Sequence, residues 1–428
     1  MKKVGVAILG LGVVGGGTYQ ILKEHREFYQ KNHKIDLVVE AVLERNVEKA
    51  VALGVEREKI AANIQEICSN PDVDIVVEVM GGVEPARTFV LDCLHAGKSV
   101  VTSNKELFCK YNHELEVAAK KNHCGLFYEA SCVGGVPVIR ALLDNLQGNK
   151  ILSMMGIING TTNYILTKMS SEGVSYQEVL KEAQKLGYAE ANPTADVEGY
   201  DAAYKLSILS SLAFHTKIPF SKIYREGITD ISVTDINYGK KFGYVLKLLA
   251  TGKNGDNGIE VRVHPAFIKS SHPLASVNDS YNAVYITGDC VEDVMLYGRG
   301  AGALPTGSAI VGDIIYCATH SNYQYSTFKN TAEASPSTKF IENFESAYYI
   351  RLKATDKPGV LAKVSSIFAK CGISVAQMSQ ESQGDADGSV PLIFITHTTR
   401  ENNVKKAVSL INQSNDIAQV AAVIRVVS

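Results

Sequence analysis

The first thirty residues place the strongest constraint on the fold. A short apolar segment, VGVAIL (4–9), leads directly into GLGVVG (10–15), and a helical pattern follows from Gly16 to about Tyr29. Strand, GxGxxG and helix in this order form the context that a dinucleotide-binding motif requires. The alternative is a glycine-rich turn with a purely structural role. We favour the binding site, because the motif lies at the N-terminus and in register with both flanking elements.

Each glycine of this motif has its own task in a dinucleotide site. Gly10 makes the tight turn, Gly12 lets the backbone approach a pyrophosphate, and Gly15 lets the helix pack on the strand. The helix N-terminus then offers free N–H groups to the phosphates. The predicted cofactor loop consists of Gly10, Leu11, Gly12, Val13, Val14 and Gly15.

A second strand is predicted over residues 35–43 and is followed by Glu44 and Arg45. A Rossmann domain contacts the adenosine ribose at this place. An acid accepts from the 2′-OH and favours NAD, whereas an Arg binds a 2′-phosphate and favours NADP. Both residue types are present, so the sequence leaves the cofactor preference open. Either residue could also be a solvated strand end.

Two further strand ends carry polar groups. Lys105 lies just past the strand and turn at 98–107, where open α/β sheets bind ligands, although a Lys there can also be plain surface. A strand at 125–131 brings Glu129 next to a Gly-Gly turn whose carbonyl oxygens suit a hard cation, but composition alone favours an ordinary β–α turn. Cys132 has no His nearby in sequence and is predicted to be a buried thiol rather than a nucleophile.

The stretch LGYAEANPTADVEGYDAAYK (186–205) places five charged groups beside an apolar segment, LSILSSLAF (206–214). Charges near a core are costly unless they are paired or used. Asp201 and Lys205 are four residues apart, so on a helix they share one face. The alternative is an ordinary surface ion pair at a helix start.

Composition narrows the class of protein. A chain of 428 residues accommodates two or three domains, and a net charge of −2 gives no reason to expect nucleic acid or a membrane surface as partner. No apolar run reaches about 18 residues, and the N-terminus is interpreted as a strand rather than a signal peptide. The eight cysteines are scattered without a CxxC pair, which favours reduced thiols in the cytoplasm.

The pattern changes along the chain and predicts a fold of α/β and α+β parts. Residues 1–135 form a Rossmann-type dinucleotide-binding domain, and residues 136–325 a mixed α/β domain for catalysis and dimerisation. Thr161 or Thr162 is expected near a helix N-cap within the second domain. Residues 326–345 form a linker, and residues 346–428 show the β-α-β-β-α-β order of a ferredoxin-like domain.

A second glycine-rich segment, YGRGAGALPTGSA (297–309), leads into a helix near the end of the second domain. Its place in the chain allows it to return and close over a cofactor. The alternative is a glycine-rich loop of purely structural use.

With these residues noted, the chain resembles homoserine dehydrogenases along nearly its full length. The resemblance rests on several motifs together, and the C-terminal part resembles an ACT domain. No aspartokinase portion precedes the first motif, so the chain is similar to the monofunctional form. The motifs are GLGVVGGG (10–17), VVTSNKEL (100–107), EASCVGGVPVI (129–139), NGTTNYIL (159–166), residues 186–205, residues 297–309 and DKPGVLAKVSSIFAKCGISV (356–375).

The resemblance implies reversible hydride transfer between NAD(P)H and L-aspartate 4-semialdehyde, giving L-homoserine on the route to threonine and methionine. Lys205 would donate the proton, and Lys105 would lie across the site. Asp201 would orient the substrate and the Lys, Glu190 would hold the substrate ammonium, and Asp196 would support them. The cofactor would also contact Arg45, Lys105, Gly187 and Gly302.

Family members also bind a monovalent cation, usually sodium. Position by position, the implied ligands are Glu129 and the carbonyls of Cys132, Gly134 and Val136. Many members have EASVAGGIP where this chain has EASCVGGVP, which backbone ligation tolerates. The resemblance implies NADP as cofactor, but Glu44 before Arg45 keeps NAD open.

The ACT resemblance implies feedback regulation. L-threonine is the implied inhibitor at the DKPGVL turn, and a homodimer or homotetramer is the implied assembly, formed through the sheet region after residue 140 and through ACT pairing. On this basis, deletion from about residue 340 onward should leave activity and remove threonine sensitivity.

Two alternatives remain open. One is a phosphorylating semialdehyde dehydrogenase, which needs a thiol nucleophile with a His base. Cys132 is the only plausible thiol for that role. The other is a non-catalytic amino-acid sensor that keeps the ACT domain and a relic Rossmann fold; the Lys105, Glu190, Asp201 and Lys205 set argues against it.

Overall fold

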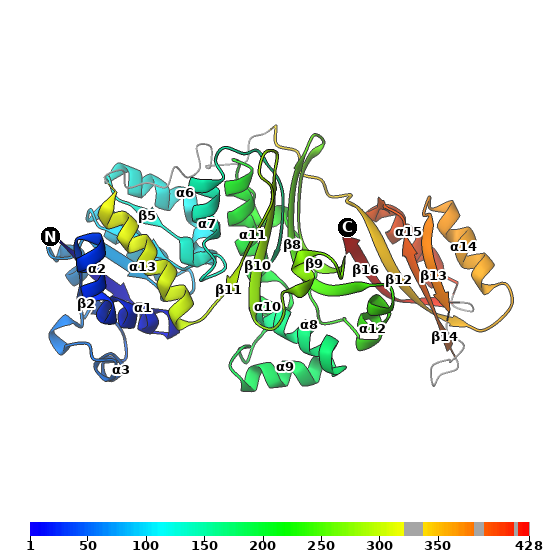
Figure 1. The fold of residues 1–428 in the computed structure, drawn as a ribbon, viewed down its shortest axis with the longest axis horizontal. Helices are drawn as coiled ribbons and strands as arrows, with labels where there is room; N and C mark the ends of the chain where they lie inside the picture. The colour runs from blue at the N-terminus through cyan, green and yellow to red at the C-terminus, as the bar shows by residue number, and fades with distance from the viewer. Residues whose placement is uncertain (321–336, 381–388, 415–417, 428) are drawn as a thin grey trace.

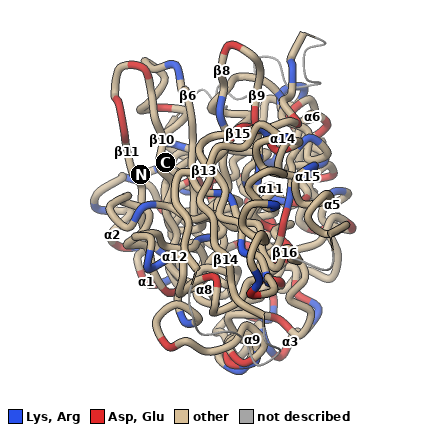
Figure 2. Tube along the Cα trace, turned by 90° about the vertical axis from the view of Figure 1, so that its right-hand side faces the viewer, with Lys and Arg blue, Asp and Glu red and all other residues tan. Residues whose placement is uncertain are grey.

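The computed structural model describes residues 1–320, 337–380, 389–414 and 418–427. Three bodies lie side by side along the long axis, with the N-terminal domain at one end, a central domain, and the C-terminal domain at the other end (Figure 1). Among the described residues, no helix has the length and apolar character needed to cross a membrane. Basic and acidic residues are interspersed along the trace in Figure 2, in keeping with the near-neutral net charge.

The N-terminal domain has the predicted Rossmann-type sheet. Its five parallel strands lie in the order β2-β1-β3-β4-β5, so the strand order reverses beside β1, which is where such sheets bind ligands. Residues 6–9 of β1 are fully buried, as a strand covered on both faces requires. The strands are β1 Lys2–Leu9, β2 Ile35–Leu43, β3 Ile75–Glu78, β4 Ser99–Thr102 and β5 Leu126–Phe127.

The first helix differs from the prediction at both ends. It begins at Val13 rather than Gly16, because the Gly16 N–H already bonds to the Gly12 carbonyl at 2.9 Å. It ends at Glu24, where His25 leaves helical geometry, and a separate helix follows. The domain's helices are α1 Val13–Glu24, α2 Arg26–His33, α3 Val47–Ala52, α4 Ile64–Ser69, α5 Ala86–His95 and α6 Lys105–Lys121.

The central domain is built on an antiparallel sheet with helices packed against it. The elements are α7 Val138–Arg140, β6 Ile151–Ile157, α8 Gly160–Glu172, α9 Tyr176–Lys185, α10 Thr194–Val197, α11 Tyr200–Ala213, β7 Tyr224–Arg225, α12 Val233–Lys241, β8 Tyr244–Gly255, β9 Gly258–Lys269, β10 Tyr281–Gly288, β11 Glu292–Arg299 and α13 Ala303–Thr319.

Helix α13 returns to the N-terminal domain and lies beside α1 (Figure 1). The approach is close because both helices carry glycine at the contact. A Cβ on Gly17 would lie 2.3 Å from the Ala303 carbonyl oxygen, and one on Gly307 would lie 3.0 Å from the backbone nitrogen of Thr18. The second glycine-rich segment therefore brings α13 against α1, which is the helix that follows the predicted cofactor loop.

The C-terminal domain has the predicted ferredoxin-like order, with one additional two-residue strand, β15. Its sheet is continuous with that of the central domain, because β16 pairs in parallel with β9 through residues 425–427 and 266–268. Residues 326–336 of the predicted linker lie outside the described residues. The elements are β12 Glu345–Thr355, α14 Val360–Lys370, β13 Val375–Gln380, β14 Ser389–Thr396, β15 Thr399–Arg400, α15 Glu401–Asn412 and β16 Ala418–Val427.

Candidate active site

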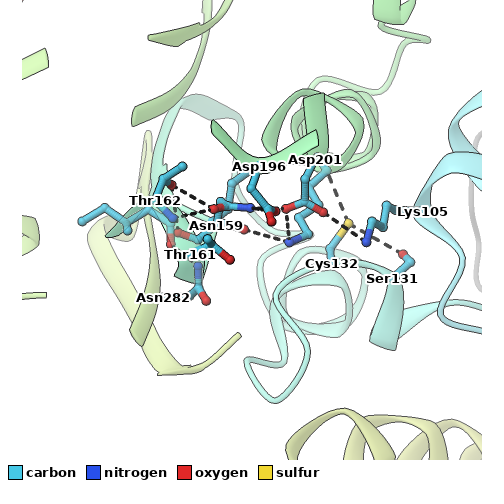
Figure 3. A network of polar contacts seen from close by, with 12 residues as sticks. Lys105, Ser131, Cys132, Asn159, Thr161, Thr162, Asp196, Asp201 and Asn282 are labelled. Carbon is cyan, nitrogen blue, oxygen red and sulfur yellow. Dashed lines mark hydrogen bonds and ion pairs between the residues drawn. The ribbon is translucent and has the colours of Figure 1, made fainter. Parts of the chain in front are cut away.

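Asp201 lies between two lysines at the junction of the N-terminal and central domains. Its Oδ2 is 2.7 Å from Lys205 Nζ, one turn further along α11, and its Oδ1 is 3.1 Å from Lys105 Nζ, at the start of α6. Lys205 Nζ also donates to the Ile158 carbonyl at 2.9 Å. The i,i+4 pair predicted from the sequence is therefore present, and the fold adds the second lysine from another domain (Figure 3).

The two lysines differ in their access to solvent. The Asp201 side chain is 8% exposed and that of Lys205 is 11% exposed, whereas that of Lys105 is 41% exposed. Burial alone would raise the pKa of Asp201, but the charges of Lys205 and Lys105 outweigh burial and hold that pKa below its ordinary value. The charge of Asp201 in turn raises the pKa of Lys105. The carboxylate is thus kept ionised between two ammonium groups.

Asn159 joins two acids of the 186–205 stretch to the start of α8. Its Nδ2 donates to Asp196 Oδ1 at 2.7 Å and to Asp201 Oδ2 at 2.9 Å. Its Oδ1 accepts the Thr162 backbone N–H at 2.8 Å, which makes Asn159 the N-cap of α8, and Thr161 and Thr162 lie near this cap as predicted. Because a backbone N–H can only donate, this bond fixes which end of the amide faces the acids.

Lys105 is placed by the turn that precedes it. Asn104 caps α6 through its Oδ1, which accepts the Leu107 N–H at 3.1 Å, and its Nδ2 donates to the Gly82 carbonyl at 2.6 Å. The turns after β3 and β4 are thereby joined at the carboxyl edge of the sheet. Lys105 is the first residue of α6 and extends from this edge toward α11.

The acids of the 186–205 stretch differ in whether they take part in this network. Asp196 contacts Asn159, and burial, followed by the charge of Asp201, raises its pKa. The Glu190 side chain is exposed on the loop that follows α9. The neighbouring loop is held to α8, because the Thr161 hydroxyl donates to the Tyr188 carbonyl at 2.7 Å.

Two glycines predicted to contact the cofactor have positive φ angles. Gly187 follows α9 with φ 78° and is exposed in the loop that leads to Glu190. Gly302 has φ 125° and caps the start of α13. Gly302 lies one residue before Ala303, which packs on Gly17, so its position is close to the helix of the glycine motif.

The glycine motif has the shape that a dinucleotide site requires. Gly10 has φ 93°, and a Cβ on Gly15 would lie 2.0 Å from the Gly10 carbonyl oxygen, so both positions demand glycine. A Cβ on Gly12 would meet nothing within 4 Å, which leaves space above the loop. A groove of about 620 Å³ is lined in part by Leu11, Gly12 and Val13. These features fit a bound pyrophosphate.

Glu44 is held by the backbone of the same loop. Its Oε2 accepts the Leu11 N–H at 2.7 Å and its Oε1 accepts the Asn46 N–H at 3.0 Å. Burial raises the pKa of Glu44, but these backbone hydrogen bonds outweigh burial and lower it overall. Arg45 is exposed beside it, two residues after the end of β2. The acid therefore supports the cofactor loop, while the arginine is left at the surface.

The turn after β5 differs from the predicted strand. β5 ends at Phe127, and Glu129–Ser131 form a 3-10 helix. The Glu129 carboxylate accepts the N–H groups of Ile139 and Arg140 at 2.9 and 2.7 Å. Burial, followed by the charge of Asp313, raises its pKa to about 8. A buried carboxylate beside a glycine-rich turn is a donor set that fits a hard cation.

Cys132 is a fully buried thiol, as predicted. Its side chain is 0% exposed, and burial raises its pKa to about 12. Its Sγ lies 3.9 Å from the Lys205 carbonyl oxygen. Such a thiol has little thiolate character and is a poor nucleophile.

Sequence reasoning missed Asn159 and Asn104. Asn159 begins the NGTTN segment, and a polar residue directly after a strand and before a helix is the signal of an N-cap. That signal identifies the cap but not the two acids that the amide binds. These residues together form a site that can donate a proton: a carboxylate and a carbonyl hold a buried ammonium group, and a second ammonium group belongs to a partly exposed side chain.

Three family models match the chain. The homoserine dehydrogenase model matches residues 137–315, the homoserine dehydrogenase NAD-binding model matches residues 10–129, and the ACT model matches residues 348–415. The homoserine dehydrogenase of Bacillus subtilis is 36% identical over 429 residues, covering 100% of this chain and 99% of the relative.

Solved structures agree with these matches. A homoserine dehydrogenase from Thiobacillus denitrificans has a TM-score of 0.92 and 39% identity, covering 100% of this chain and 99% of that chain. A hyperthermophilic archaeal homoserine dehydrogenase in complex with NADPH has a TM-score of 0.63 and 29% identity, covering 74% of this chain and 98% of that chain.

Proposed function

The chain belongs to the homoserine dehydrogenase family of oxidoreductases, and we propose that it reversibly reduces L-aspartate 4-semialdehyde to L-homoserine in threonine and methionine biosynthesis. The observation that carries this proposal is the position of Asp201 between Lys205 and Lys105. Two ammonium groups directed at one small site can stabilise negative charge on a carbonyl oxygen as it becomes an alkoxide.

Lys205 is the proposed proton donor. Asp201 Oδ2 and the Ile158 carbonyl hold its ammonium group in one orientation inside the protein. A bound nicotinamide supplies the hydride. Lys205 donates a proton to the substrate oxygen, and Asp201 stabilises the charged form of the lysine before transfer. Lys105, whose side chain is partly exposed, provides a second positive charge at the same carboxylate.

Glu190 and Asp196 are the proposed partners of the substrate ammonium group. Carboxylates bind ammonium groups through charge-assisted hydrogen bonds. Asp196 is already joined to Asp201 through Asn159, and Glu190 lies on the exposed loop after α9. The proposed cofactor contacts Gly187 and Gly302 have the support of the family resemblance, and Gly302 also that of the packing of α13 on α1.

We propose NADP(H) as the cofactor, with NAD(H) as a second substrate. The NADPH complex of the archaeal relative supports this choice. In this chain Glu44 is engaged by two backbone N–H groups, whereas Arg45 is at the surface and can bind a 2′-phosphate. Arg45→Ala should raise KM for NADPH and leave KM for NADH unchanged. Equal effects on both cofactors would contradict the proposed role of Arg45.

We also propose a sodium ion at Glu129 and the carbonyls of Cys132, Gly134 and Val136. The buried carboxylate and its turn support the site. Thermal unfolding in sodium chloride and in choline chloride at equal ionic strength tests it. Sodium should raise the melting temperature of the wild type and have no such effect on Glu129→Gln. An equal response of both proteins would exclude this site.

L-threonine is the proposed effector of the ACT domain. A pocket of about 370 Å³ lies at the DKPGVL turn, and its lining includes Asp356, Lys357, Gly359 and Gln380. That size suits a small amino acid. Asp356→Asn should weaken inhibition by threonine without changing turnover in its absence. Unchanged inhibition would place the effector elsewhere.

Truncation is a poor test of this regulation in the observed fold. Removal of the C-terminal domain would take away β16, which pairs with β9, and Arg351, which binds Asp235 at 2.7 Å across the domain boundary. Point substitutions in the pocket avoid this damage.

We propose a homodimer or homotetramer that assembles through the sheet. We also propose a cytoplasmic location, which is in keeping with the eight free cysteines. Light scattering of the purified protein measures the assembly.

The decisive experiment is turnover of L-aspartate 4-semialdehyde with NADPH and with NADH, with and without L-threonine. Oxidation of the reduced cofactor would support the proposed reaction. Folded protein that binds threonine but turns over neither cofactor would favour the amino-acid sensor. In a parallel assay with the semialdehyde and NADP⁺ or NAD⁺, reduction of the cofactor that requires phosphate and Cys132 would favour the phosphorylating enzyme.

A further inference from the structure

The segment Tyr224–Glu226 lies between Arg425 of the C-terminal domain and the junction of α10 with α11 in the active site. Tyr224 and Arg225 form β7, which pairs in parallel with β9. Successive side chains of a strand point to opposite faces. Tyr224 and Glu226 therefore share one face and Arg225 occupies the other.

The Tyr224 and Glu226 face contacts Arg425 of β16. Arg425 Nη1 donates to Glu226 Oε2 at 2.7 Å and Nη2 donates to the Tyr224 hydroxyl at 3.0 Å. Glu401 of α15 accepts from the same guanidinium at 2.6 Å. The Arg425 side chain is 5% exposed. This arginine is therefore a buried anchor from the C-terminal domain.

The Arg225 face contacts the junction between α10 and α11, the two helices that carry Asp196 and Asp201. Its guanidinium donates to the Glu198 carbonyl, and its Cζ lies 3.5 Å from the centroid of the Tyr200 ring. Glu198 and Tyr200 stand between the two acids in sequence. Just beyond this segment, the backbone N–H of residue 228 also donates to the carbonyl of residue 197 at 2.9 Å. The backbone between Asp196 and Asp201 is thereby held by contacts with residues 225 and 228.

We propose that Arg225 is a positioning residue for Asp196 and Asp201, and that Arg425 holds Arg225 in place through Tyr224 and Glu226. The inference rests on the proposed function only for its kinetic measurement. It connects the C-terminal domain to the two acids through the 224–226 segment.

A double-mutant cycle tests this connection. Arg225→Met keeps the apolar stem and removes the donor, and we expect kcat to fall about tenfold or more, because the acids lose their orientation. Arg425→Lys keeps the charge and loses the fork geometry, and we expect a loss of about threefold or more. In the Arg225→Met background, Arg425→Lys should cause little further loss of kcat, because both act through one element.

Arg351→Lys is the matched control. Arg351 is also buried at the domain boundary, but it binds Asp235 of α12 rather than the 224–226 segment. We expect it to lower the melting temperature while kcat stays within about twofold of wild type. Equal loss of kcat in Arg351→Lys and Arg425→Lys would overturn the proposal, as would additive effects of the Arg225 and Arg425 substitutions.

Amide hydrogen exchange gives a second measurement that does not depend on turnover. Residues 196–203 should exchange faster in Arg225→Met and in Arg425→Lys, but not in Arg351→Lys. Unchanged exchange of this segment in the first two variants would overturn the proposal even if the reaction itself were different. Absence of turnover in the wild type, with the expected exchange pattern, would instead count against the proposed reaction alone.

Discussion

Asn159 donates a side-chain hydrogen bond to Asp201 across 42 residues of sequence, at 2.9 Å. The other amide hydrogen binds Asp196, and the amide oxygen caps α8. One buried side chain therefore holds two neighbouring carboxylates and a helix start together. A neutral amide with two N–H donors can join two acids in this way without adding a charge.

Asn159→Asp should separate the cap from the contacts with the acids. Aspartate caps a helix about as well as asparagine, so the start of α8 should be kept, but the loss of two buried hydrogen bonds and the added like charge should lower the melting temperature. A third carboxylate beside Asp196 and Asp201 should lower kcat about a hundredfold and move the acid limb of the pH–kcat profile upward, because like charges favour protonation. Wild-type kcat with an unchanged profile would contradict this role.

Lys205→Met should lower kcat by about three orders of magnitude, because it removes the proposed proton donor. Lys105→Met should cause a smaller loss, since this lysine is more exposed and lies on the outer side of Asp201. Steady-state rates in both directions of the reaction measure the effect. Lys110→Met is a control, because Lys110 pairs with Glu106 on the exposed side of α6. A larger loss in Lys105→Met than in Lys205→Met would reverse the assignment.

Cys132→Ser should leave kcat within about twofold of wild type, because a buried thiol with a raised pKa takes no part in the chemistry. Thiol alkylation of the folded protein should label the exposed Cys290 and spare Cys132. A large loss of activity in Cys132→Ser, with normal folding, would support the thiol-dependent alternative.

Lys247 should make stability rise with pH in the alkaline range. Its side chain is buried, and burial lowers its pKa from 10.5 to about 8. Between these values the unfolded chain binds more protons at this residue than the folded chain, so the free energy of unfolding increases with pH, by on the order of 3 kcal/mol in total. The negative charge of Asp279 opposes this lowering of the Lys247 pKa.

Denaturant unfolding of wild type and Lys247→Met across this pH range checks the prediction. The wild type should gain stability relative to the variant as pH rises, whatever the difference at neutral pH. A constant difference between the two proteins would show that Lys247 has an ordinary pKa.

The local sequence was sufficient to predict several structural features of this protein. The glycine motif and its flanking strand and helix, and the Asp201–Lys205 pair, depend on residues close in sequence, where periodicity and backbone conformation decide the geometry. The ferredoxin-like order at the C-terminus followed from the same patterns. The predicted start of α1 was three residues late, because glycines inside the first turn conceal a helix boundary.

Only the tertiary structure decided how these parts meet. It brought Lys105 to Asp201, turned the Asn159 amide toward both acids, laid α13 on α1, and joined β16 to β9. Each of these contacts spans a long stretch of sequence and depends on how whole elements pack. Local propensity contains no information on such packing, which is why the sequence identified the reactive groups and the fold determined their arrangement.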